Sequence, residues 1–152
     1  MAEKTLTLCI VHDSGRVLLG MKKRGFGADR WNGFGGKLEE NETALRAAHR
    51  ELEEESGIKA QDMKERGMIR FHFLDTGVVM NVFLFSVTKY SGEPVETEEM
   101  RPQWFNFDEI PFKDMWPDDR FWLPNFLKGK NVFGKIDFIG NDDIVHVELD
   151  FA

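Results

Sequence analysis

The segment GKLEENETALRAAHRELEEESGI, Gly36–Ile58, decides how the rest of this sequence is interpreted. Its pattern predicts an α-helix over Asn41–Ser56, with Asn41 as the N-cap and Gly57 ending the helix in a left-handed conformation. Apolar residues at helical spacing predict one buried stripe on this helix. That stripe is expected to contain Leu45, Ala48 and Leu52.

The same helix carries three glutamates at the spacing i, i+3 and i+4, namely Glu51, Glu54 and Glu55. Their carboxylates are expected to converge within an arc of about 100°. A run of like charges usually just faces water. Two features favour a site instead: Ala44 and Ala47 would leave room above the arc, and Arg50 can orient Glu54 four residues later.

Convergent carboxylates form a hard-oxygen site, which selects Mg²⁺, or Mn²⁺ as a substitute, over zinc. Mg²⁺ is typically shared between protein carboxylates and substrate phosphates, so the expected ligand is a di- or triphosphate. Metal ions can offset phosphate charge and activate water, so the chemistry needs no Ser, Cys or His nucleophile.

The segment also resembles the signature of the Nudix family at every fixed position, which here are Gly36, Glu42, Arg50, Glu51, Leu52, Glu54, Glu55, Gly57 and Ile58. Members of that family hydrolyse a nucleoside diphosphate linked to another moiety. The resemblance implies a catalytic and metal-binding set of Glu51, Glu54, Glu55 and the backbone carbonyl of Gly35. It also implies that Glu42 and Arg50 brace the helix. Glu99 is similar to an additional glutamate that some members supply, although an exposed acid in an acidic loop is an equal alternative.

Strands dominate the remaining sequence and predict an α/β fold. They are expected at Thr5–His12, Arg16–Lys22, Gly67–Leu74, Val78–Lys89, Gln103–Phe107, Val132–Ile139 and Ile144–Phe151. A second helix is expected over Asp118–Lys128, kinked or shortened by Pro124. A mixed β-sheet covered by two main helices is the natural architecture, and the resemblance implies an α/β/α sandwich of the Nudix type. We expect a single domain over residues 1–152.

Three further blocks, Gly20–Lys37, Glu98–Pro102 and Ile110–Asp119, resemble the animal, MutT-like branch of the family. That branch comprises oxidised purine nucleoside triphosphatases. The resemblance implies Mg²⁺-dependent hydrolysis of 8-oxo-dGTP and 2-hydroxy-dATP to the monophosphate and pyrophosphate, which sanitises the nucleotide pool and prevents mutagenic incorporation into DNA. Two alternatives stay open: a Nudix enzyme for methylated purine triphosphates or ADP-ribose, and a nucleotide-binding sensor without turnover.

The same resemblance implies a substrate pocket formed by Thr7, Lys22, Phe26, Asn32, Phe34, Gly35, Gly36, Lys37, Phe71, Met80, Trp116, Pro117, Asp118 and Asp119. Trp116 can stack on a base, which is worth about 1–3 kcal/mol. Asn32 can pair with a purine edge, and Lys22 can meet a phosphate. On the residues alone, Trp116, Phe71 and Met80 could equally belong to the core.

The adjacent Asp118 and Asp119 should not both ionise at a half-buried aromatic site, because desolvation and mutual repulsion raise one pKa. A protonated and an ionised aspartate together could present different hydrogen-bonding faces to different oxidised purines. The alternative is structural, since Asp118 could serve as the N-cap of the second helix.

Composition limits the partners of the chain. Its 152 residues carry a net charge of −7, so the surface would repel nucleic acid and anionic membranes. No apolar run approaches the roughly 18 residues of a membrane helix. The one cysteine, Cys9, fits a reducing compartment: the cytoplasm, the nucleus or the mitochondrial matrix. A monomer that binds a nucleoside triphosphate is expected.

Overall fold

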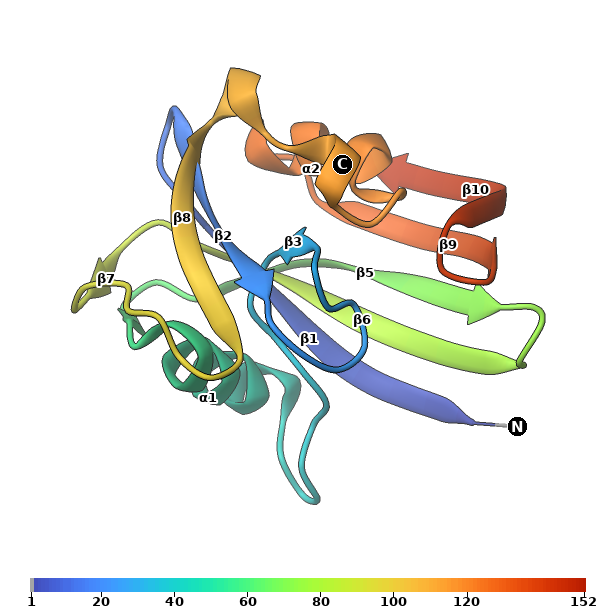
Figure 1. Cartoon of the computed structure of the whole chain (residues 1–152), viewed down its shortest axis with the longest axis horizontal. Helices are drawn as coiled ribbons and strands as arrows, with labels where there is room; N and C mark the ends of the chain where they lie inside the picture. The colour runs from blue at the N-terminus through green and yellow to red at the C-terminus, as the bar shows by residue number, and fades with distance from the viewer. Residues whose placement is uncertain (1) are drawn as a thin grey trace.

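The computed structural model describes residues 2–152, and in that range eight strands form one mixed sheet in the order β10-β9-β5-β6-β1-β2-β3, with β8 pairing to β2. Figure 1 shows the strands wrapped into a curved layer between helices. The strands of this sheet are β1 Glu3–His12, β2 Arg16–Lys22, β3 Trp31–Asn32, β5 Lys64–Phe73, β6 Val78–Val87, β8 Met100–Asn106, β9 Val132–Ile139 and β10 Asp143–Phe151. The other elements are α1 Ala44–Ser56, α2 Asp119–Leu127, the 3-10 turns Phe107–Glu109 and Phe112–Asp114, and a small pair formed by β4 Lys59–Ala60 and β7 Tyr90–Ser91.

Strand β1 lies at the centre of the sheet and is paired differently along its length. It runs parallel to β6 over Glu3–Val11, but it pairs with β2 only at Val11 and His12. Along the rest of β1 the place of β2 is taken by a loop, in which Phe34 exchanges hydrogen bonds with Cys9 and the carbonyl of Gly36 accepts from Thr7. This gap between β1 and β2 brings the glycine-rich loop against the sheet.

Two apolar clusters lie on opposite faces of the sheet. One contains Trp122, Leu123 and Phe126 of α2 together with residues of β5 and β9 such as Ile69 and Phe138. The other contains Ala48 and Leu52 of α1 together with residues of β1 and β6 such as Cys9 and Phe85. Because each helix covers one face, the expected α/β/α sandwich with two main helices is confirmed.

The structure corrects several details of the first helix. Thr43, not Asn41, is the N-cap, since its side chain accepts a hydrogen bond from the N–H of Arg46. Asn41 lies in a left-handed turn with φ 64°. The expected buried stripe is wrong at Leu45, which is 47% exposed, and Ala47 is fully buried and therefore leaves no open space above the helix.

The other ends of elements agree more closely with the sequence pattern. Gly57 ends α1 with φ 80°, as expected. The bounds of β2 and β9 are those that the pattern predicts. Pro124 lies inside α2 and does not interrupt it. Neither helix in residues 2–152 combines the length and the apolar character that crossing a bilayer would require.

Candidate active site

Three glutamates of α1 differ widely in their surroundings. Glu55 is only 5% exposed, and its Oε1 accepts a hydrogen bond of 2.8 Å from the N–H of Gly35. The side chain of Glu51 is 15% exposed, whereas that of Glu54 is 59% exposed. The arc therefore runs from a buried carboxylate beside the glycine loop to a carboxylate in solvent.

The glycine loop reaches this position because its residues lack side chains. A Cβ on Gly35 would lie 1.8 Å from the carbonyl oxygen of Thr7, and one on Gly36 would lie 2.8 Å from Cδ of Glu51. Any larger residue would push the loop off β1 or away from α1. The glycines thus place backbone N–H and C=O groups beside the buried carboxylates.

Arg50 fixes the helix to the loop that precedes it. Its guanidinium donates to both carboxylate oxygens of Glu42, over 2.7 and 2.8 Å, and to Oε1 of Glu51 over 2.8 Å. It also donates to the carbonyl of Lys37 over 3.1 Å. The hydrogen bonds from Arg50 to Glu42, together with one from the N–H of Glu39, lower the pKa of Glu42 to about 2. Arg50 is closer to Glu51 than to Glu54, whose Oε2 lies 3.5 Å from Nη1. The expected contact that orients Glu54 is therefore present but long.

The carboxylates around Glu55 act on one another. The pKa of Glu55 is raised to about 8, mainly by burial and also by the charges of Glu51 and Glu99, while the hydrogen bond from Gly35 acts in the opposite direction. Glu99 is bound by Arg24, whose Nη2 and Nε donate over 2.8 and 3.1 Å. Within residues 2–152, no three Asp, Glu, His or Cys side chains converge closely enough to coordinate one ion as they stand.

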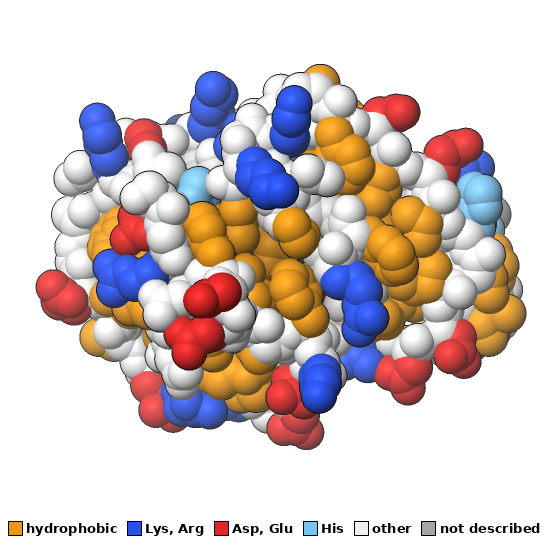
Figure 2. Space-filling model, turned by 90° about the horizontal axis from the view of Figure 1, so that it is seen from above, with side chains coloured by type: hydrophobic (Ala, Val, Ile, Leu, Met, Phe, Trp, Pro, Cys, Tyr) orange, Lys and Arg blue, Asp and Glu red, His pale blue; other side chains and the backbone are white. Residues whose placement is uncertain are grey.

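A cavity of about 250 Å³ opens between the loop, β1, β6 and the start of α2. Figure 2 shows one face of the molecule, on which apolar side chains gather and are bordered by acidic and basic ones. Twelve of the fourteen residues expected in the substrate pocket line the cavity: Thr7, Lys22, Phe26, Asn32, Gly35, Gly36, Lys37, Phe71, Met80, Trp116, Asp118 and Asp119. Pro117 is outside the lining, and Phe34 is fully buried in the cluster beneath α1, so the structure places neither side chain in the pocket.

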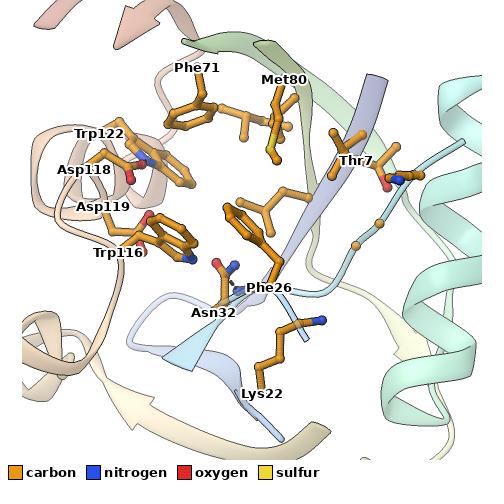
Figure 3. Close-up of a pocket in the computed structure, with 18 of the residues that line it drawn as sticks. Thr7, Lys22, Phe26, Asn32, Phe71, Met80, Trp116, Asp118, Asp119 and Trp122 are labelled. Carbon is orange, nitrogen blue, oxygen red and sulfur yellow. Dashed lines mark hydrogen bonds between the residues drawn. The ribbon is translucent and has the colours of Figure 1, made fainter. Parts of the chain in front are cut away.

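One end of the cavity is aromatic and acidic. Figure 3 shows Trp116, Asp118, Asp119 and Trp122 gathered there. The indole N–H of Trp122 donates to Oδ2 of Asp118 over 2.9 Å, and both aspartates are 3% exposed. Burial raises the pKa of Asp118 to about 6 and that of Asp119 well above its ordinary value, because the charge of Asp118 adds to the effect of burial there. Burial and mutual repulsion therefore oppose full ionisation of the pair.

The alternative role of Asp118 as a helix cap is confirmed in its position only. Asp118 occupies the N-cap position of α2, but its side chain makes no capping hydrogen bond. Its carboxylate turns to Trp122 instead. Oδ2 of Asp119 is buried without a hydrogen-bond partner among the described residues. Such a group is costly unless a ligand satisfies it, so the arrangement indicates a binding site.

The other end of the cavity approaches α1. Lys22 and Thr7 lie on this side in Figure 3, and the charge of Lys22 lowers the pKa of Glu55 against its burial. The Thr7 hydroxyl is buried without a partner in residues 2–152. Between the two ends, Oδ1 of Asn32 accepts from the N–H of Gly33 over 2.9 Å. One cavity thus connects an end formed by aromatic rings and the Asp118–Asp119 pair to an end that contains Glu55 and Lys22.

Sequence reasoning missed nine residues that line the cavity: Leu6, Leu8, Gly33, Phe73, Val82, Leu84, Met100, Trp122 and Phe138. Strand alternation could have found some of them, because Phe73 follows Phe71 on the same face of β5, and Val82 follows Met80 on β6. Trp122 lies four residues after Asp118, so the two share a helix face. Phe138 lies in the C-terminal hairpin, and no nearby sequence pattern indicates that it lines the cavity.

Comparison with known proteins identifies the architecture. The family model of the NUDIX domain matches residues 3–126. The chain belongs to the Nudix family. This Nudix chain is 52% identical over 147 residues to the oxidized purine nucleoside triphosphate hydrolase of Danio rerio, covering 97% of this chain and 94% of that protein. It is 50% identical to the protein of the same name from Mus musculus, covering 94% and 92%.

A solved structure supports the same fold. The crystal structure of a MutT protein from Bacillus halodurans superposes with a TM-score of 0.86 at 27% identity, covering 97% of each chain. As a Nudix hydrolase, this chain requires a divalent metal ion. Oxygen donors fit such an ion, since Glu55 and Gly35 line the cavity and the carboxylate of Glu51 lies against Gly36, which also lines it.

Proposed function

We propose that this Nudix hydrolase cleaves oxidised purine nucleoside triphosphates, 8-oxo-dGTP and 2-hydroxy-dATP, to the monophosphate and pyrophosphate, with Mg²⁺ as its metal. The observation that carries the proposal is the single cavity, which joins the Trp116, Asp118 and Asp119 end to the Glu55 end. A purine base needs an aromatic face and hydrogen-bonding groups, which the first end offers, whereas a phosphate chain needs positive charge, which a metal ion and Lys22 would supply at the second end. The names of the zebrafish and mouse relatives support the same substrate class.

At the phosphate end, the proposed metal ligands are Glu51, Glu54, Glu55, Glu99 and the carbonyl of Gly35. A bound divalent cation would offset phosphate charge and make water more acidic. The Gly35 N–H orients Glu55, and Arg50 holds Glu51 and, through Glu42, the loop in front of it. Lys22 supplies positive charge near the phosphates. Water attacks at the linkage between the α- and β-phosphates.

At the base end, the proposed recognition depends on one shared proton. Asp119 carries it and donates a hydrogen bond, while Asp118 accepts from Trp122 and from the base. If the proton moves to Asp118, Asp118 becomes the hydrogen-bond donor and Asp119 the acceptor. This second arrangement of donor and acceptor would suit a second oxidised purine. Trp116 offers a face for stacking, and Asn32 offers an amide group to the purine edge. We therefore expect Asp119→Asn to change the ratio of the two activities, and equal losses on both substrates would contradict the shared-proton model.

The decisive experiment measures rates on a panel of nucleotides with Mg²⁺: 8-oxo-dGTP, 2-hydroxy-dATP, a methylated purine triphosphate, ADP-ribose and undamaged dGTP. Faster turnover of the two oxidised purines supports the proposal. Preference for ADP-ribose or the methylated nucleotide supports another Nudix activity, and binding without turnover supports a sensor. The presence of all three glutamates of the Nudix signature, Glu51, Glu54 and Glu55, argues against the sensor.

A pair of variants tests the chemistry. Glu55→Gln should fold and lose activity by orders of magnitude. Glu53→Gln is the matched control, because Glu53 lies on the same helix, its side chain is 53% exposed and its carboxylate forms an ion pair with the exposed Lys59. Equal rates for Glu55→Gln and the wild type would remove Glu55 from the metal set.

We further propose that the chain acts as one Nudix domain and as a monomer, without nucleic acid or membrane partners. The net charge of −7 supports the last point. Cys9 is buried as a free thiol, which is compatible with the reducing cytoplasm, nucleus or mitochondrial matrix. Size-exclusion chromatography with light scattering tests the oligomeric state.

A further inference from the structure

Arg30 lies outside the cavity but against one of its walls. Its guanidinium carbon is 4.4 Å from the centroid of the Trp116 ring, which is the geometry of a cation–π contact. The side chain is only 21% exposed, although it begins in a surface loop. A planar guanidinium stacked on an indole restricts how that ring can tilt.

The C-terminal hairpin holds this guanidinium in place. Nη1 of Arg30 donates to the backbone carbonyl of Asn141 over 3.0 Å, and Nη2 is ion-paired with the carboxylate of Asp142. Both residues belong to the turn between β9 and β10. This turn follows the segment matched by the family model, which ends at residue 126. A part of the chain beyond the family match therefore reaches the wall of the cavity.

The loop that carries Arg30 is itself closed at its base. The N–H of Lys22 donates to the carbonyl of Arg30 over 3.1 Å, and the N–H of Asp29 donates to the carbonyl of Lys22 over 2.8 Å. Phe26, at the tip of the loop, lies 5.0 Å from Trp116 between ring centroids. The loop therefore contacts Trp116 at two points, and its closure ties Arg30 to Lys22.

We propose that Arg30 is a positioning residue for the purine, held by the turn at Asn141 and Asp142 so that it fixes the Trp116 ring in the orientation on which the base stacks. The inference rests on the proposed function, because it assigns Trp116 to the base. It makes the C-terminal hairpin a determinant of affinity for the base, with no part in cleavage of the phosphate chain.

The contacts of Arg30 should differ in how strongly they hold its guanidinium in place. Asp142 is 80% exposed, and ion pairs between exposed groups contribute little. The backbone acceptor at Asn141 and the stacking on Trp116 remain when the charge of Asp142 is removed. We therefore expect a small effect from Asp142→Asn and a larger one from Arg30→Gln.

Steady-state kinetics on 8-oxo-dGTP test the proposal. Arg30→Gln should raise KM by about 5- to 10-fold with kcat changed less than about 2-fold, since the loss affects stacking and leaves the phosphate end intact. Asp142→Asn should raise KM by about 2-fold. Asp143→Asn is the matched control, with the same change of charge one residue away, and its KM should equal that of the wild type. Arg30→Lys keeps the charge but loses the planar stacking group, so it should restore less than half of the loss.

A second measurement needs neither metal nor substrate. In the ¹H–¹⁵N spectrum of the ligand-free protein, the indole N–H resonance of Trp116, assigned by its absence in Trp116→Phe, should shift or broaden in Arg30→Gln and stay unchanged in Asp143→Asn. Thermal melting establishes that each variant is folded, and Asp142→Asn provides the second variant if Arg30→Gln does not fold.

The outcomes separate this inference from the proposed function. An unchanged KM and an unchanged Trp116 resonance in a folded Arg30→Gln protein would overturn the positioning role. Full activity in Arg30→Lys would also overturn it, because charge alone would then suffice. If the wild type turns over no oxidised purine, the proposed function fails, while the resonance of Trp116 still reports whether Arg30 fixes the ring.

Discussion

Replacement of Trp122 by Phe removes one hydrogen-bond donor from a buried carboxyl group and keeps an aromatic ring in its place. The indole N–H donates to Asp118 over 2.9 Å, and the two side chains are 1% and 3% exposed. Burial raises the pKa of Asp118 to about 6, and this hydrogen bond acts in the opposite direction by stabilising the ionised form. The variant should therefore make the ionised form of Asp118 less stable in the folded protein.

The magnitude follows from the two contributions that are lost. A hydrogen bond to a charged group contributes about 1.5–3 kcal/mol, and the smaller ring leaves a gap that costs about 1 kcal/mol more. Above the pKa of Asp118, the free energy of unfolding should thus fall by about 2.5–4 kcal/mol. For a chain of this size that corresponds to a Tm lower by about 5–16 °C.

The loss should depend on pH with a definite sign. Below about pH 6 the Asp118 carboxyl is neutral in the folded protein, and a hydrogen bond to a neutral group contributes only about 0.5–1.5 kcal/mol. Removing the donor raises the folded pKa further, so the folded state binds protons more tightly than the unfolded state over a wider range. The stability that the neutral carboxyl contributes is then lost over a longer pH interval, from the unfolded pKa up to the raised folded pKa. The destabilisation should be larger at about pH 7.5 than at about pH 5 by roughly 1–2 kcal/mol.

Urea unfolding at the two pH values measures this difference. Trp31→Phe is the control, because Trp31 belongs to the same apolar cluster and packs edge-on against Phe105. Its cost should not vary with pH. A destabilisation by Trp122→Phe that is identical at both pH values would refute the view that the indole stabilises an ionised Asp118.

Three further predictions concern the loop, the helix and the metal. Gly35→Ala should displace the loop, destabilise the fold and reduce turnover by more than about 10-fold, because its Cβ would meet the Thr7 carbonyl at 1.8 Å; Gly15→Ala, with open space around it, should behave as the wild type in melting and rate assays. Thr43→Ala should lower the free energy of unfolding by about 1 kcal/mol, since it removes the cap on the Arg46 N–H, and an unchanged denaturation midpoint would contradict this. Chelation of divalent ions should abolish turnover and Mg²⁺ should restore it, as followed by pyrophosphate release; activity that survives chelation would exclude the metal-dependent reaction.

Local patterns were sufficient to predict much of the fold. Apolar spacing and Gly57 located α1, and strand alternation gave the bounds of β2 and β9. These features depend on residues close in sequence. The prediction of the N-cap was wrong because Asn41 and Thr43 are both good capping residues. Asn41 instead adopts a left-handed turn in the loop whose Lys37 carbonyl accepts from Arg50, and this tertiary contact is not visible in the local pattern.

The site was harder to predict because its parts come from distant segments. Spacing on one helix was enough to select the glutamates, but it could not show that Glu55 is buried and Glu54 exposed, since the loop at Gly35 makes that difference. Phe34 was placed in the pocket by its neighbours in sequence, yet its backbone pairs with Cys9 and directs the side chain under α1. The contact of Arg30 with Asp142 joins residues 112 positions apart and leaves no local pattern.

The charges explain how a chain with a net charge of −7 can accept an anion. Two acidic groups near the glutamates of α1 are already paired with cations, Glu42 with Arg50 and Glu99 with Arg24. The buried carboxyls are of another kind: burial raises the pKa of Glu55, Asp118 and Asp119, so each binds positive charge readily. In the proposed function, that charge at the aspartates is a proton, and the purine base exchanges hydrogen bonds with the pair. At Glu55 we propose that a divalent cation takes the place of the proton beside the phosphate chain, so the two ends of one cavity reduce their negative charge by different means.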